Sequence, residues 1–581
     1  MTPINRKILR DLWRIKGQAL AIALVIGSGV ATYIMSLGTL YSLEETRDAY
    51  YERYRFAQVF APLKRAPQRL KADIADIAGV KTVETRIVKN VTLDIPGLSE
   101  PASGRLISLP ETREQTLNVL HLRQGRLLAP GRPDEVLVNE AFALANEFKP
   151  GNTFAAIING HKRTLTIVGV VLSPEYVYAL GPGALMPDDQ RFGIIWMEEK
   201  ALEAAFDLGG SFTEASMTLE RGVDASEVIA ALDRMTEKFG GIRAYAQKDQ
   251  ISNWFVTNEI NQLRAMGNVA PPLFLGIAAF LLHIVASRLV ETERQQIGLL
   301  KAFGYSDGNV AWLYIKLVLI IVIFGIVTGL AFGTWLGRGM TELYTEYFRF
   351  PFLYYIIDGS IYITATLISI TVGLAGALTS VWRAQRLMPA VAMTPPPPTS
   401  YQTFWVERLL RLKTLSEPSR SRRSTQNVWY ERLLRLKTLS EPSRMILRHS
   451  LRWPLRSGLS VLGTALAVAI LISTIFFLDS MDRLVNVQFF QTQRQDVMLH
   501  FADAKSASSL SEVARLPGVL ISEPFRSVPT RLVAGHWTNY ENIIGLASDA
   551  SMFRPLGDGF KPMKLPAEGL VLSKKMAEVL H

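Results

Sequence analysis

Five long runs of apolar residues divide the chain into membrane-spanning and polar parts. Each run contains hardly any charged residue and, at about 1.5 Å per helical residue, can cross a hydrocarbon core of about 30 Å. The predicted spans are residues 18–40, 266–288, 313–337, 357–382 and 457–478. This pattern predicts a multi-pass membrane protein.

Basic residues fix the predicted orientation of these spans. Residues 383–456 hold fifteen Arg and Lys against four Glu, and five basic residues precede the first span. Because loops rich in Lys and Arg stay in the cytoplasm, we predict a cytoplasmic N-terminus and the cell inner (plasma) membrane as the location. The net charge of +11 follows from this bias, so we predict no nucleic-acid partner. The predicted cytoplasmic segments are 1–17, 289–312 and 383–456, and the predicted extracytoplasmic segments are 41–265, 338–356 and 479–581.

Residues 1–17 are predicted to form a helix at the membrane surface. Pro3 suits a first helical turn with Thr2 as its cap, and Ile8, Leu9 and Leu12 give an apolar face among basic residues. Membrane lipid is therefore one predicted partner.

Residues 41–265 form a segment large enough for a hydrophobic core of its own. Apolar residues recur at helical spacing in 67–78 and 224–239, and short β-rich runs with turn residues surround them. Asn159 and Gly160 separate two such runs and predict a tight hairpin. We predict an α+β extracytoplasmic domain.

The loop 289–312, between the second and third spans, has the pattern of a short amphipathic helix. Ile297, Leu300 and Lys301 fall at helical spacing, and Gly304 follows where a glycine commonly ends a helix. A cytoplasmic helix tied directly to two spans would move both spans when a partner pushes on it.

This loop resembles the coupling loop of the FtsX-like permeases of ATP-binding-cassette (ABC) transporters, a family that includes the MacB type. Glu293-Arg294, the run from Ile297 to Ala302, and Gly304-Tyr305 match the family pattern, whereas Gln296 stands where the family usually has Glu. Residues 125–170 are also similar to the periplasmic core domain of the MacB-like permeases. The resemblance implies eight ATPase-coupling residues: Glu293, Arg294, Gln296, Ile297, Gly298, Leu300, Lys301 and Gly304.

The same resemblance implies a fold and a function. The fold class is a membrane α-helical bundle with α+β, MacB-like extracytoplasmic domains, as in type VII ABC transporter permeases. The function is that of a permease subunit, which couples ATP hydrolysis by a separate ATPase subunit to export or periplasmic handover of a hydrophobic substrate or a lipoprotein. Such coupling by transmitted movement is called mechanotransmission. A periplasmic adaptor or partner protein is a further implied partner.

A second function stays open at this point. Some members of the family act as membrane regulators that activate a periplasmic enzyme without moving a substrate, and no residue of this chain separates the two roles. Both roles require the ATPase subunit.

The chain lacks the residues of several common chemistries. It has no cysteine, no zinc-protease motif of the H-E-x-x-H type and no G-x-x-x-x-G-K-[ST] phosphate loop. We therefore expect no catalytic residue, no metal and no cofactor in this chain, and ATP hydrolysis on a separate subunit.

An internal repeat is visible along the chain. Arg6–Arg10 resembles Arg444–Arg448, and Val136–Ala143 resembles Leu570–Ala577, at a nearly constant separation of about 437 residues. The second unit stops at residue 581, part-way through its outer domain, so we predict a truncated second repeat. A fourteen-residue segment, 407–420, also recurs residue for residue at 431–444 within the basic linker.

Overall fold

The computed structural model describes residues 3–580, apart from residues 99, 112, 113, 183, 185, 387, 391–453, 500, 502–504, 536 and 567. The chain divides into two units, residues 1–463 and 464–581. The duplicated segments 407–420 and 431–444 lie outside the described residues, as does Thr2.

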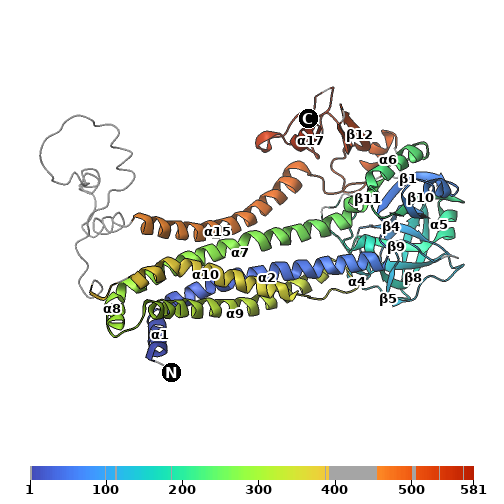
Figure 1. The fold of residues 1–581 in the computed structure, drawn as a ribbon. Coiled ribbons are helices and arrows are strands. Elements are labelled where there is room, and N and C mark those ends of the chain that lie inside the picture. Colours follow the sequence, from blue (N-terminus) through green and yellow to red (C-terminus); the bar gives the residue numbers. More distant parts are fainter. Residues whose placement is uncertain are drawn as a thin grey trace. The chain divides into compact units, whose positions relative to one another are not determined.

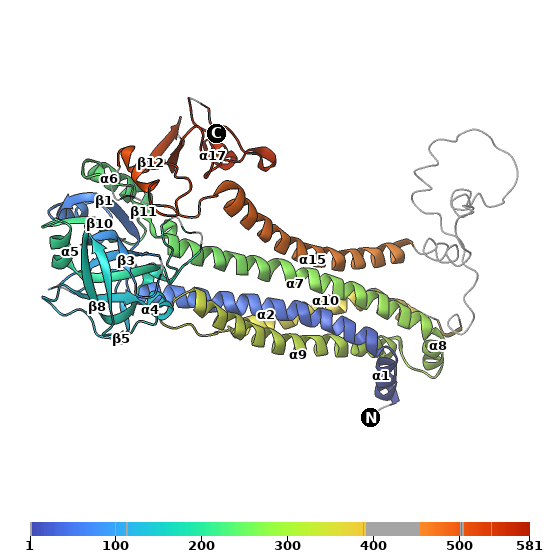
Figure 2. The ribbon, with the colours of Figure 1, turned by 180° about the vertical axis from the view of Figure 1, so that it is seen from behind.

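The first unit contains a bundle of long helices and an α+β domain (Figure 1). Among the described residues, four helices are long and apolar enough to cross a membrane. These are α2 (Lys16–Arg53), α7 (Ile251–Thr292), α9 (Asp307–Tyr347) and α10 (Gly359–Arg386), which lie side by side. The short helices α1 (Pro3–Arg14) and α8 (Arg294–Ala302) lie at the end of the bundle remote from the strands (Figure 2).

Three of these helices extend far beyond the predicted spans. Helices α2, α7 and α9 contain 38, 42 and 41 residues, so each is about 60 Å long, twice the thickness of a hydrocarbon core. Residues 41–53 and 251–265, placed by the sequence within the extracytoplasmic segment 41–265, continue α2 and α7, and residues 338–347, predicted as part of a short loop, continue α9. They stay helical because their inward side chains, including Tyr50, Val256 and Tyr344, form one buried apolar cluster.

Small residues bring α2 and α9 close together. Gly325, Gly329 and Gly333 recur every four residues on α9 and face Ala23, Gly27 and Ala31 of α2. A Cβ atom at Gly329 would lie 2.6 Å from Cβ of Val30 and 2.8 Å from the Gly27 carbonyl oxygen. Close backbone approach through small residues is a common way to pack membrane helices, because lipid offers no hydrophobic driving force between them.

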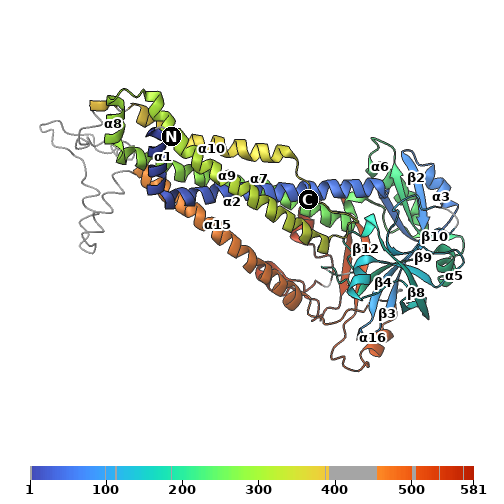
Figure 3. The ribbon, with the colours of Figure 1, turned by 90° about the horizontal axis from the view of Figure 1, so that it is seen from below.

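Eleven strands build the α+β domain, which lies between α2 and α7 in the sequence (Figure 3). Its strands are β1 (Val59–Pro67), β2 (Val80–Arg86), β3 (Val88–Asp94), β4 (Ala102–Leu109), β5 (His121–Gly125), β6 (Glu135–Asn139), β7 (Thr153–Ile158), β8 (His161–Leu172), β9 (Phe192–Glu198), β10 (Ser211–Leu219) and β11 (Tyr245–Ala246). Its helices are α3 (Leu70–Ala75), α4 (Glu140–Ala145), α5 (Glu199–Ala205) and α6 (Ala225–Thr236), with 3₁₀ turns η1 (Pro174–Tyr176), η2 (Glu237–Phe239) and η3 (Gln247–Asp249).

The larger sheet closes on itself. Strands pair in the order β5-β8-β6-β9-β4-β3-β7, and β7 pairs back onto β8, so β8, β6, β9, β4, β3 and β7 form a ring without free edges. One buried apolar cluster draws side chains from all six strands and from α4 and α5. The predicted hairpin joins β7 to β8, with positive φ at both Asn159 (49°) and Gly160 (81°), as a type I′ turn requires.

The smaller sheet has the order β11-β1-β10-β2 and packs against α3 and α6. Helix α6 confirms the helix predicted within 224–239, whereas α3 is shorter than the predicted segment 67–78. Leu70, Ile74, Val228 and Leu232 bury the apolar faces of the two helices in one core with the sheet.

The second unit begins within α15 (Pro454–Asn486), which contains the predicted fifth span. A π-helical turn, η5 (Val487–Thr492), α16 (Ser508–Val513), the hairpin β12 (Phe525–Ala534) and β13 (Trp537–Leu546), the 3₁₀ turn η6 (Asp558–Phe560) and α17 (Lys574–Leu580) follow. The elements α16, β12, β13 and α17 stand about 437 residues after α3, β3, β4 and α4. Gly79 and Gly518 also share a left-handed backbone, with φ of 89° and 88°, so the structure supports the internal repeat.

Candidate functional site at helix α8

Helix α8 forms a compact connection between α7 and α9. It ends in a Schellman motif, in which Gly304 (φ 91°) donates to the Lys301 carbonyl at 3.0 Å and Tyr305 donates to the Leu300 carbonyl at 3.2 Å. Ser306 then caps α9, and its Oγ accepts a hydrogen bond from the Asn309 amide. The predicted helix and the predicted role of Gly304 as its end are both confirmed.

Glu293, at the junction of α7 and α8, is buried in a cluster of charged groups. Its Oε2 lies 2.5 Å from Lys7 Nζ, its Oε1 lies 3.0 Å from Arg14 Nη2, and the Tyr314 hydroxyl donates to it at 3.4 Å. Lys7 also pairs with Asp11 at 2.5 Å. Only 1% of Glu293 is exposed, so this carboxylate faces Lys7 and Arg14 of α1 and not the surface.

Three other predicted coupling residues also point into the bundle. Ile297 and Gly298 are buried, and Ile297 belongs to the main core of the bundle. The Lys301 ammonium donates to the Gln385 carbonyl oxygen on α10 and pairs with Asp307 on α9, both at 2.6 Å. These residues hold α8 against three helices, whereas Arg294 and Leu300 are half-buried.

The outward face of α8 is partly apolar. Gln296 is exposed, and beside it are two exposed residues that the family pattern did not single out, Leu299 and Phe303. Their exposed fractions are 46% and 75%. Their spacing could have indicated this face, because residues 295, 299 and 303 lie on one side of the helix. The family pattern pointed elsewhere, since most of its residues are buried.

The opposite ends of the long helices are joined to the α+β domain by hydrogen bonds. The Tyr54 hydroxyl, at the end of α2, contacts His121 Nδ1 on β5 at 2.7 Å. Gln250, the N-cap of α7, donates to the Glu175 carbonyl of η1 at 2.7 Å. After α9, the Arg349 amide donates to the Val177 carbonyl at 2.9 Å. All three helices are thus connected to the domain through short, direct contacts.

A buried ion cluster holds η1 to the smaller sheet. The Arg86 guanidinium on β2 pairs with Glu175 at 2.5 Å and with Glu214 on β10. Burial raises the pKa of the Glu214 carboxyl, and the adjacent Arg86 opposes this shift. Burial alone would lower the pKa of Arg86, but Glu175 and Glu214 raise it well above its ordinary value. The cluster therefore links the segment that receives α7 to the rest of the domain.

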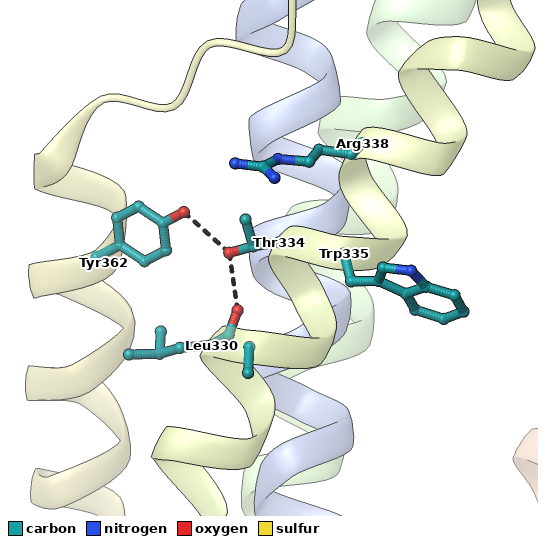
Figure 4. A pocket seen from close by; sticks show the side chains of 6 residues that line it. Leu330, Thr334, Trp335, Arg338 and Tyr362 are labelled. Atoms are coloured by element: carbon teal, nitrogen blue, oxygen red, sulfur yellow. Dashed lines mark hydrogen bonds between the residues drawn. The ribbon is translucent and has the colours of Figure 1, made fainter.

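Residues of α9 and α10 line a shallow pocket near the end of the bundle that meets the α+β domain (Figure 4). The Thr334 hydroxyl bridges the Leu330 carbonyl at 2.8 Å and the Tyr362 hydroxyl at 2.9 Å. Arg338, Trp335 and Ala331 also line the pocket. An arginine and a tryptophan at this level of a span are typical of a membrane interface.

Among the described residues, no group of three or more His, Asp or Glu side chains could hold a metal ion. The clusters at Glu293 and Arg86 consist of ion pairs and hydrogen bonds between side chains of this chain, and they hold its elements together.

Comparisons with known proteins agree with the sequence pattern. Residues 268–389, from α7 to just beyond α10, match the family model described as the C-terminal domain of FtsX-like permeases. No curated protein matches the chain.

Two solved structures show similarity to about a third of the chain. The extracellular domain of the ABC-type transporter YknZ from Gram-positive bacteria is 12% identical, with 33% of this chain and 98% of that chain covered and a TM-score of 0.22. The periplasmic region of MacB from Actinobacillus actinomycetemcomitans is 14% identical, with 34% and 92% covered and a TM-score of 0.23.

The fold class is thus a bundle of membrane helices with an α+β domain inserted between its first two long helices. The coupling-loop residues at 293–305 lie within the segment that the family model matches. The membrane part of this chain, from residue 268 to residue 389, is therefore similar to the C-terminal domain of the FtsX-like permeases.

Proposed function

We propose that this chain is the membrane subunit of an ABC-type transporter and that a separate ATPase subunit docks on the outward face of α8. The single observation that carries this proposal is the continuous path from α8 to the α+β domain. Helix α8 is fixed to α7, α9 and α10, and α7 and α9 run without interruption to the hydrogen bonds at Glu175 and Val177. Movement imposed at α8 reaches the domain along these helices.

The residues of α8 take two separate roles in this proposal. Gln296, Leu299 and Phe303 contact the ATPase, because they are exposed and because apolar and aromatic side chains dominate the energy of most protein interfaces. Glu293, Ile297, Gly298 and Lys301 position the helix, and Gly304 ends it. Arg294 and Leu300 lie between the two groups.

The proposed activity is mechanotransmission. The ATPase binds and hydrolyses ATP in the cytoplasm, and the resulting movement of α8 drives the extracytoplasmic domain, which exports or hands over a hydrophobic substrate or a lipoprotein. Among the described residues, buried apolar side chains and close glycine contacts fill the interior of the bundle. This packing favours transmitted movement over a hydrophilic channel. A periplasmic partner protein would receive the movement or the substrate.

The test is a charge substitution on the outward face of α8. The double variant Leu299→Asp, Phe303→Asp should lose the co-purifying ATPase by at least about tenfold, because truncated or charged hot-spot residues typically cost an interface about 2 kcal/mol or more. The matched control is Leu127→Asp, Leu144→Asp, which adds the same charge at exposed leucines of the α+β domain, 56% and 59% exposed.

Peptide sequencing must identify the co-purified protein by its phosphate-loop motif, and both variants must insert into the membrane to the parental level. The proposal is rejected if the α8 variant retains the ATPase at the parental ratio, or if the control loses it equally.

A further inference from the structure

Helix α1 is held to the α7–α8 junction by charged residues that lie 286 and 279 residues apart in the sequence. Lys7 and Arg14 approach the two oxygens of Glu293 at 2.5 and 3.0 Å. Apolar contacts reinforce this attachment, since Ile8 is buried in the core of the bundle and Leu12 packs against it. A buried carboxylate that lost both cations would be strongly destabilised, because it would remain in a low-dielectric environment without a counter-charge. Glu293 therefore keeps α1 attached to α8.

The other face of α1 is basic and apolar. Arg6, Leu9, Arg10 and Trp13 share this face at helical spacing, and all four are exposed, with Trp13 at 72%. The ammonium of Lys16 lies 4.4 Å from the Trp13 ring. Asp11, the sole carboxylate in the α1 sequence, is buried and paired with Lys7. The outer face thus carries positive charge that no acidic residue of α1 offsets.

The position of α1 suits a membrane surface. The helix leaves the bundle sideways at the end where α8 lies, directly before the apolar part of α2 (Figure 2). A helix with apolar and basic residues on one face lies in the headgroup region, with its apolar side chains in the acyl boundary and its cations among anionic headgroups. In α1, Leu9 and Trp13 are the apolar side chains of this face, and Arg6 and Arg10 are its cations.

We propose that α1 binds the anionic phospholipid surface of the membrane and that the Lys7–Glu293–Arg14 cluster passes this attachment on to α8. The acidic residue of the coupling loop is then a positioning residue for a lipid-bound helix. A consequence, which rests on the proposed docking function, is that the docking face of α8 is presented correctly only when α1 is seated on anionic lipid.

The lipid half of the proposal can be tested with one spin label. The chain has no cysteine, so Leu9→Cys carries a nitroxide at a single site of the full chain. The protein is placed in nanodiscs of phosphatidylcholine alone, or of phosphatidylcholine mixed with phosphatidylglycerol, without any ATPase. We expect the label to be immobilised and accessible to oxygen in the mixed discs, and mobile and accessible to a water-soluble nickel reagent in phosphatidylcholine.

Charge variants identify the groups responsible. Arg6→Gln with Arg10→Gln should shift the label back toward water in the mixed discs. The control Arg69→Gln with Arg221→Gln removes the same charge from exposed sites of the α+β domain and should leave the label unchanged. Equal spectra in both lipids, or equal effects of both pairs, would overturn lipid binding, as would immobilisation that appears only when the ATPase is added.

The Glu293 half is tested in the same discs. In phosphatidylcholine, where the Glu293 contact restrains α1 without help from anionic lipid, Glu293→Gln should raise the mobility of the label above the parental value, and Glu293→Asp should bring it back toward that value. Should Glu293→Gln fail to fold, Lys7→Gln with Arg14→Gln releases the same contact while leaving α8 unaltered. A label whose mobility in phosphatidylcholine equals the parental value in all of these variants would overturn the attachment. No ATPase is present, so these outcomes are independent of the docking proposal.

Discussion

Glycine spacing on α9 sets the geometry of the bundle. Gly325, Gly329 and Gly333 allow α2 and α9 to touch through their backbones, and the proposed transmission of movement requires this close packing. At the same scale, the ends of the long helices depend on single side chains such as Tyr54 and Gln250. The function proposed here therefore rests on a few residues with no chemistry of their own.

The first prediction compares one substitution at two glycines of α9. Gly329→Ala should destabilise the protein by about 1–3 kcal/mol, the usual cost of overpacking, because the new methyl group would meet Val30 and the Gly27 carbonyl. Gly339→Ala should be neutral or slightly stabilising, since nothing lies within 4 Å of its Cβ position. Thermal unfolding in detergent measures both, and equal melting temperatures would refute the close contact.

The second prediction concerns His121, which meets Tyr54 at the end of α2. Burial lowers the pKa of the His121 imidazole, and Arg123 and Arg53 lower it further. Because the unfolded chain then binds the proton more readily than the folded chain, the contribution of His121 is complete above its unfolded pKa and is lost as the pH falls through that value toward the folded pKa.

The melting temperature of the parental protein should therefore fall more between about pH 7.5 and about pH 5.5, on either side of the ordinary histidine pKa of about 6.5, than that of His121→Gln. The other six histidines are common to both proteins. Parallel melting curves against pH for the two proteins would contradict this sign.

At the scale of elements, the sequence predicted what depends on local pattern. The amphipathic spacing and Gly304 were sufficient for α8, and Asn159-Gly160 was sufficient for the β7–β8 hairpin. The buried side of the α7–α8 junction could not be predicted, because Glu293 is covered there by Lys7 of α1, which stands 286 residues earlier in the chain. The length of α2 was also missed, since Tyr50 is buried by aromatic residues that follow α9.

The third prediction tests the ion cluster that joins β2, β10 and η1. Arg86→Met should destabilise the α+β domain by about 3–5 kcal/mol, because it leaves Glu175 and Glu214 buried without their cation. The control Lys162→Met removes an exposed pair with Asp94, 65% and 56% exposed, and should cost less than about 1 kcal/mol. Denaturant unfolding measures both, and similar midpoints would show that the cluster does not hold the domain together.

On the scale of the whole molecule, the distribution of hydrophobic runs and the repeat were predictable, because both are carried by composition and spacing over hundreds of residues. The ring of six strands was not predictable, since its closure depends on β7 pairing with β3 and β8 at once. In the proposed function, the direction of movement depends on the orientation of the chain in the membrane, which the positive charge of residues 1–17 and 383–456 predicts.

The fourth prediction tests that orientation. Asn152→Cys lies in the exposed loop before β7, and Gln295→Cys lies on the exposed face of α8. In intact cells, an impermeant thiol reagent should label the first and not the second, and both should react after the membrane is opened. Labelling of position 295 alone in intact cells would reverse the orientation and remove α8 from the cytoplasm.

The most direct test of the central claim is photo-crosslinking from α8 in native membranes. A benzophenone side chain at Phe303, which is 75% exposed, should capture a protein whose peptides contain a phosphate-loop motif, and one at Leu20, which is 50% exposed on α2, should not. Capture of that ATPase from position 303 alone is the result predicted for a docking face on α8. Absence of any nucleotide-binding protein at position 303, with the protein correctly inserted, would contradict the account.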